Sequence, residues 1–169
     1  MFSNLKGSYR SCGGLDDLMV SILLRYPEIA TVKYNPRQRL LRFTFMILEQ
    51  IDEQQLSEFC TRLVKALEAF NRLERRSPGI VSSDWTVHGK VTRLNVFRDV
   101  ATLFPDEISL LVDYFIEWFN PEPPEEVGEE ELLYQEEIIN QSLEQLKHLK
   151  NDRWIIALRE EGRVLVFDK

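Results

Sequence analysis

The first third of the chain carries two hydrophobic periods, one helical and one alternating. Over residues 15–26 apolar side chains recur at i, i+3, i+4 and i+7, which predicts a helix with one buried face, and Pro27 ends it. Residues 29–34 and 40–48 are rich in β-branched and aromatic side chains and predict a β-hairpin. In its second strand the apolar residues alternate onto one side, so the other side should meet solvent or a partner.

The middle of the chain predicts a second helix, extended structure and a third helix. The second helix covers residues 53–76, where an apolar stripe follows Asp52, a residue suited to the N-cap position. Residues 81–100 have an extended pattern whose phase changes near residues 88–90, which fits a β-bulge or, as we favour, a hairpin turn. Residues 106–119 predict a third helix, apolar on nearly all sides and therefore buried on most of them.

Residues 45–67 and residues 97–119 resemble each other weakly. An offset of 52 residues places the apolar positions of residues 45–67 on those of residues 97–119. The match suggests two strand–strand–helix units that share one sheet. Because the aligned residues are almost never identical, similar packing needs explain the match better than a proven duplication.

A segment rich in proline and glutamate interrupts the pattern at residues 120–128. Its three prolines prevent regular hydrogen bonding, and its charge keeps it extended. We interpret it as a linker between a core domain, residues 1–119, and an arm, residues 129–169, which starts with a helix over residues 129–150. Together these elements predict an α+β fold: a two-layer domain with a mostly antiparallel sheet covered by helices, plus a C-terminal helix–hairpin arm.

The hairpin that ends the arm, residues 154–158 and 164–167, is apolar on both faces. Such a strand pair must be covered on both sides, and an isolated hairpin is only marginally stable. The arm should therefore dock, either by completing the sheet of its own chain or by pairing with a second chain. The leading hypothesis is a non-enzymatic protein-interaction module, a homodimer or a binder of another protein. The expected contact residues are Trp154, Ile156, Leu158, Val164, Leu165 and Phe167.

The distribution of charge raises an alternative function. The net charge is −7, but residues 1–100 carry 15 basic and 11 acidic side chains, whereas residues 101–169 carry 6 basic and 17 acidic ones. Positive charge gathers on the first hairpin beside a tyrosine, a combination that can bind single-stranded nucleic acid by phosphate contacts and stacking. The second hypothesis is therefore nucleic-acid or ribonucleoprotein binding. Its candidate contacts are Lys33, Tyr34, Arg37, Arg39 and Arg42, with Tyr34 as the stacking platform.

Residues with catalytic or metal-binding chemistry are few. The two histidines, His88 and His148, stand apart from any nucleophile in the sequence, so no catalytic set is predicted and an enzyme is the less favoured class. The two cysteines, Cys12 and Cys60, have no metal-binding spacing, and Cys60 belongs to a buried helix face. The acidic residues 125–131 lack the ligand spacing of a calcium loop. We therefore predict no metal and no cofactor.

Two further expectations concern ligands and location. Trp85, Tyr114 and Trp118 could line a small-ligand pocket, although aromatic residues at such positions more often belong to the core. No apolar run is long enough to span a bilayer, and the first residues lack the pattern of a secretory signal. The sequence therefore predicts a cytoplasmic protein with no membrane partner, and it does not identify a biological process.

Overall fold

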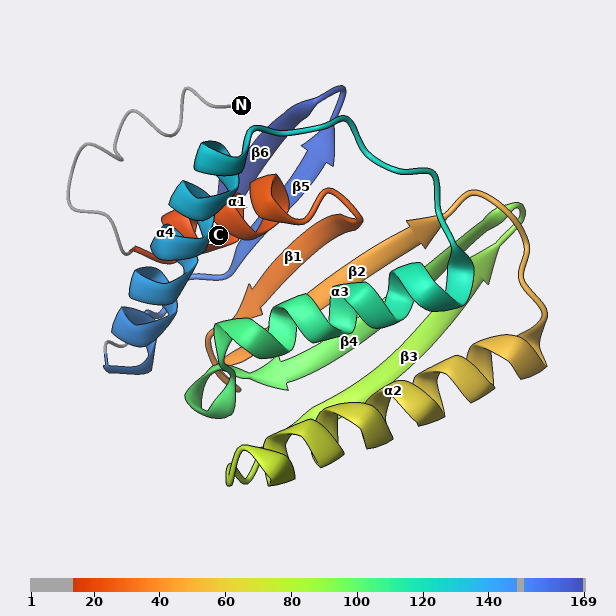
Figure 1. Ribbon diagram of the computed structural model, residues 1–169, viewed down its shortest axis with the longest axis horizontal. Helices are drawn as coiled ribbons and strands as arrows, with labels where there is room; N and C mark the ends of the chain where they lie inside the picture. The colour runs from red at the N-terminus through yellow and green to blue at the C-terminus, as the bar shows by residue number, and fades with distance from the viewer. Residues whose placement is uncertain (1–13, 149–150, 169) are drawn as a thin grey trace.

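The chain forms an α+β fold built on a six-stranded antiparallel sheet, as the sequence predicts. The computed structural model describes residues 14–148 and 151–168 (Figure 1). The strand order is β3-β4-β2-β1-β5-β6, and every neighbouring pair is antiparallel. The elements are α1 Leu15–Arg25, β1 Ile29–Asn35, β2 Leu40–Ile47, α2 Glu53–Leu73, β3 Val81–His88, β4 Val91–Asp99, the 3-10 helix η2 Val100–Thr102, α3 Pro105–Phe119, α4 Glu129–His148, β5 Ile155–Glu160 and β6 Arg163–Asp168.

The periodicities predict each of these α-helices and strands to within a few residues, and they do not predict η2. At the change of phase, residues 81–100 form a hairpin rather than a bulged strand: His88 pairs with Val91, and Gly89 takes φ +59° in the turn between them. Glycine adopts this left-handed conformation without strain. Asp52 does stand at the N-cap of α2, but within the described chain its carboxylate makes no capping hydrogen bond.

The pairing of β2 with β4 joins the two strand–strand–helix units. Phe43 lies opposite Val96 and Phe45 opposite Leu94, and all four side chains are buried. Because successive side chains of a strand alternate between faces, this register places the apolar residues of both strands on one side of the sheet. A common origin of the two units stays a prediction.

All four described helices cover that same side. Helix α2 lies along β3, and α3 lies beside α2 over the middle of the sheet (Figure 1). The ring of Phe45 stacks on that of Phe115 in α3, with centroids 4.4 Å apart. Helix α1 packs on β1, β5 and β6, and α4 packs mainly on α1. This end of the molecule therefore has three layers: sheet, α1 and α4.

The hairpin of the arm is part of the same sheet. Strand β5 pairs with β1 through four residue pairs, from Thr31–Leu158 to Tyr34–Ile155. The guanidinium of Arg159 donates hydrogen bonds to the carbonyl oxygens of Leu23, at 2.5 Å, and Ile29, at 3.1 Å. The oxygen of Leu23 belongs to the last turn of α1, where carbonyls need external donors, and that of Ile29 belongs to the first residue of β1. Of the two docking modes left open by the sequence, the described chain adopts the one within its own sheet.

A buried polar network ties β4 to α3 and α2. Arg98, fully buried, is paired with Glu107, also fully buried, and donates to the carbonyl of Thr102 at 2.9 Å. Glu107 also accepts from the side-chain amide of Asn71 in α2, at 2.7 Å. Each charged group thus has partners that replace water, which is the condition for burying an ion pair.

The opposite side of the sheet is bare. We call this side, with its outward side chains, the open face. The arm hairpin was expected to be covered on both sides, but among the described residues no helix lies over its outer side. The helix-covered side takes Ile155, Ala157, Val164 and Val166, whereas Ile156, Leu158, Leu165 and Phe167 point to the open face.

Candidate protein-interaction surface

The largest apolar part of the open face is the outer side of the arm hairpin. Ile156 lies opposite Phe167 and Leu158 opposite Leu165, so the four side chains form two adjacent cross-strand pairs. Phe167 is 53% exposed, and the other three are half-buried. Trp154 precedes β5 with the same strand parity as Ile156 and is also half-buried. We call these residues the arm patch: Trp154, Ile156, Leu158, Leu165 and Phe167.

A basic row borders the arm patch on the same face. The register runs across four strands from Phe167 through Ile156 and Lys33 to Arg42. The ammonium of Lys33 lies 5.5 Å from the centroid of the Trp154 ring, within the range of a cation–π contact. Beyond Arg42 the row ends at Phe97 of β4. One face thus presents an apolar area next to two positive charges.

The other candidate residues lie elsewhere. Val164 belongs to the covered side and is only 2% exposed. Tyr34 is fully buried beneath the helices, so the structure contradicts its expected role as a stacking platform. The expectation fails because alternation puts Tyr34 opposite Leu41, on the core side, and Lys33 opposite Arg42.

The basic residues of the first hairpin also separate. The guanidinium of Arg39 donates to the carbonyl of Leu146 at 2.7 Å, so it caps the C-terminal end of α4. Arg37 is exposed in the turn between β1 and β2. Of the basic candidates on the first hairpin, Lys33 and Arg42 are the two that point to the open face of the described strands.

Two residues of this surface were not among the sequence candidates. Phe97 has the opposite strand parity from Leu94 and Val96, and this parity alone signals an outward aromatic ring on β4. Arg163 is exposed at the start of β6 and lies opposite Glu160. Its position beside the arm patch depends on the β5–β6 register, which the sequence does not specify.

The strongest electrostatic cluster of the described chain is structural. Burial raises the pKa of the Asp99 carboxyl, but hydrogen bonds from the Ile80 amide and the Thr102 hydroxyl, with the charge of Arg98, outweigh it and leave the pKa lowered. The cluster joins the start of β3, the end of β4 and η2. Its charged groups bond one another, so they are not poised toward a ligand.

Other reactive groups are sparse in the part of the chain that the structure describes. No group of three or more histidine, cysteine or acidic side chains there could hold a metal ion. Cys60 is buried against Ser83, and burial raises the pKa of its thiol, which disfavours the reactive thiolate. Cys12 lies outside the described residues. None of the described helices is both long and apolar enough to cross a bilayer.

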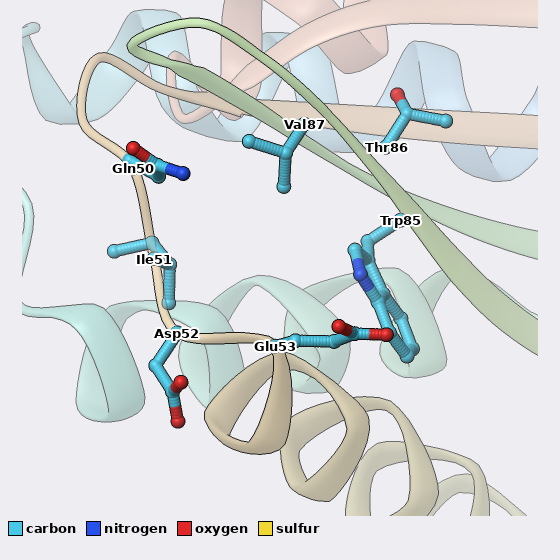
Figure 2. Close-up of a pocket in the computed structure, with 7 residues that line it drawn as sticks. All are labelled: Gln50, Ile51, Asp52, Glu53, Trp85, Thr86 and Val87. Carbon is cyan, nitrogen blue, oxygen red and sulfur yellow. The ribbon is translucent and has the colours of Figure 1, made fainter.

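A concave site of about 570 Å³ lies between the start of α2 and the hairpin β3–β4 (Figure 2). Its lining residues are Gln50, Ile51, Asp52, Glu53, Trp85, Thr86 and Val87. Tyr114 and Trp118, expected to share a pocket with Trp85, instead pack on Phe59 at centroid distances of 5.5 and 5.7 Å. The structure thus separates the predicted aromatic trio, with Trp85 in the concave site and the other two in the α2–α3 interface.

Comparison with protein-family models, curated proteins and solved structures finds no match for this chain. The function is therefore argued from the geometry of the open face.

Proposed function

We propose that this protein is a non-enzymatic protein-interaction module that associates with itself through the arm patch. The observation that carries the proposal is the uncovered outer side of the arm hairpin. Five large apolar side chains gather there in one contiguous patch. Contiguous apolar patches, unlike single exposed residues, are characteristic of interaction sites.

The firm attachment of the hairpin to its own sheet supports this role. Strand β5 pairs with β1, and Arg159 donates to the carbonyls of Leu23 in α1 and Ile29 in β1. The arm patch is therefore a preformed surface, and little conformational entropy is lost when a partner binds it. Trp154 is of a type that often carries a large share of the binding energy, and phenylalanine is enriched at the core of interfaces.

Nucleic-acid binding is the second proposal. Lys33 and Arg42 remain available to it on the open face, beside the ring of Trp154. It is weaker because Tyr34 is buried and Arg39 is bonded to the main chain of α4. The net charge of −7 also opposes association with a phosphate backbone.

The test is the solution mass of the protein, measured by light scattering coupled to size exclusion over a range of protein and salt concentrations. We expect a mass above that of one chain that persists in high salt, because apolar contacts are little screened. Replacing Leu165 by Thr together with Phe167 by Ser should return the mass to that of one chain. The matched control is Leu73→Ser, which alters a side chain that is 83% exposed at the end of α2.

A wild-type protein that has the mass of one chain at the highest concentration contradicts self-association. So does an assembly that is indifferent to the double substitution. A single-stranded oligonucleotide added at low salt separates the second proposal, since complex formation that requires Lys33 and Arg42 would favour it.

A further inference from the structure

Helix α4 carries a second exposed apolar site, on the far side of the molecule from the open face. Leu133 is 60% exposed and Tyr134 is 55% exposed. Glu130 and Glu137 flank them and are exposed as well. The spacing i, i+3, i+4, i+7 places all four side chains on one face of the helix, opposite the face that packs on α1. We call this set the α4 stripe; it is apolar in the middle and acidic at both ends.

The open face has the complementary order of charge. Lys33 and Arg42 lie on one side of the arm patch, and Arg163 lies on the other, at the outer edge of the sheet. Glu160 faces Arg163 and neutralises part of its charge. An acidic–apolar–acidic stripe can therefore set its carboxylates near these cations and its apolar middle on the arm patch.

The dimensions of the two surfaces agree. The seven steps from Glu130 to Glu137 extend about 10 Å at 1.5 Å per residue. The row from Phe167 through Ile156 to Lys33, the nearer of the two cations, crosses two strand spacings, or about 10 Å at the usual 4.8 Å per spacing. A stripe of this length covers the arm patch and reaches the basic row.

Symmetric stacking of two open faces fits less well. The whole face, six strands wide, has an area of roughly 600 Å² from the standard strand dimensions, close to the ~800 Å² that each partner buries in a typical interface. A stable sheet-on-sheet dimer would thus need the whole of the face. Because Lys33 and Arg42 lie on the two middle strands, such a dimer would bring the basic rows of the two copies together, and the like charges would repel.

The α4 stripe cannot reach the open face of its own chain. Helix α4 packs on α1, and α1 packs on the covered side of β1, β5 and β6. The sheet and α1 therefore separate the two surfaces. A stripe bound to an open face must come from another copy.

We propose that the protein assembles head to tail, with the α4 stripe of one copy bound to the arm patch and basic row of the next. This inference rests on the proposed self-association and names its geometry. The contact is heterologous, because it joins two different surfaces. It leaves one free stripe and one free open face at the ends, so it builds a ring or an open chain rather than a closed two-fold dimer.

Reciprocal charge reversal tests this geometry. One variant carries Lys33→Glu and Arg42→Glu, and the other carries Glu130→Lys and Glu137→Lys. Each alone should lose assembly, with the apparent association constant falling at least tenfold, because the contact then joins like charges. An equimolar mixture should assemble again, because each open face meets a stripe of opposite charge. Light scattering gives the mass, and circular dichroism checks that each variant is folded.

A second pair of substitutions keeps the test valid if charge reversal prevents folding. Phe167→Asp disables the open face, and Leu133→Asp with Tyr134→Asp disables the stripe; all three side chains are more than half exposed. Mixing these two variants should stop assembly at a pair of chains, since one good face and one good stripe remain per pair. Assembly of the stripe variant alone, as large as that of the wild type, overturns the head-to-tail contact and leaves the proposed self-association intact.

Two other outcomes also overturn the inference. An assembly that depends on Phe167 but not on Glu130, Glu137 or Lys33 would mean that the open faces pair symmetrically. An assembly that forms only after deletion of residues 1–13 would assign the open face to the first residues of the chain itself. In both cases the arm patch is still the contact surface.

Discussion

The two faces of the sheet differ in what covers them and in how their polar groups are bonded. The covered face is closed by four helices, and its strand residues include Val32, Phe43, Phe45 and Leu94, all fully buried. The side chains between them in each strand point to the open face, which carries half-exposed apolar side chains and two cations. Neighbouring residues of one strand therefore contribute to different surfaces: one to the buried core and the next to the open face, for which we propose a role in recognition.

The difference lies in how each face uses its polar groups. On the covered side, Arg98 and Glu107 neutralise each other without water, and Arg159 supplies donors to the end of α1. On the open face, Lys33 touches an aromatic ring but keeps its charge at the surface. The buried, bonded charges hold the helices and strands in their arrangement, whereas the charges at the surface remain accessible to a binding partner.

The largest effect is expected on the covered side, from Glu107→Ala. The substitution leaves the guanidinium of Arg98 buried without the carboxylate of Glu107, and it also removes one of the two acceptors of the Asn71 amide. We expect a loss of about 3–5 kcal/mol in the free energy of unfolding, measured by urea denaturation. Glu117→Ala, at an exposed position of the same helix, is the control and should change little.

A double variant sharpens this prediction. Arg98→Met combined with Glu107→Leu removes the buried guanidinium together with its partner and should be more stable than Glu107→Ala alone. Asp99 loses Arg98 in this variant but keeps its hydrogen bonds from the Ile80 amide and the Thr102 hydroxyl. A loss below about 1 kcal/mol for Glu107→Ala would show that water reaches Arg98, and the contrast between the faces would weaken.

An intermediate effect is expected where the arm joins the covered side. Arg159→Ala removes donors from the carbonyls of Leu23 and Ile29, and hydrogen bonds from a charged group are worth about 1.5–3 kcal/mol. The free energy of unfolding should fall by about that amount, and amide exchange should rise in β5 and β6 before it rises in β2 and β4. Arg163→Ala, an exposed arginine on the adjacent strand, should leave both unchanged.

The smallest effect on stability is expected from the open face, and two neighbours on β6 provide a matched pair. Leu165→Thr alters the open face and should cost less than about 1 kcal/mol, while Val164→Thr buries a hydroxyl on the covered side and should cost about 1–3 kcal/mol. Thermal unfolding of the two variants decides the order. Equal losses in stability would mean that a polar substitution costs no more on the covered side than on the open face.

The sequence predicts the elements well because each helix and strand carries its own period. The stripe of α2 and the alternation of β2 need no distant partner to be recognised. The pairing of Thr31 with Leu158 and the bonds from Arg159 to Leu23 and Ile29 join residues more than a hundred positions apart, and no local pattern encodes them. The prediction that Tyr34 is a stacking platform is wrong for a related reason. The local sequence shows an aromatic ring among basic residues, and only the strand register places this ring under the helices.

The pairing of β5 with β1 also sets the order in which the sheet forms during synthesis. On a ribosome the first hairpin emerges early, but the strand that completes its outer edge follows only after α4. During that interval β1 presents unpaired amides and carbonyls, the kind of edge that other chains can join. Pairing across so long a sequence separation is also slow. The synthesis of β5 therefore determines when the nascent sheet stops being open to wrong partners, and termination before residue 155 would leave that edge exposed.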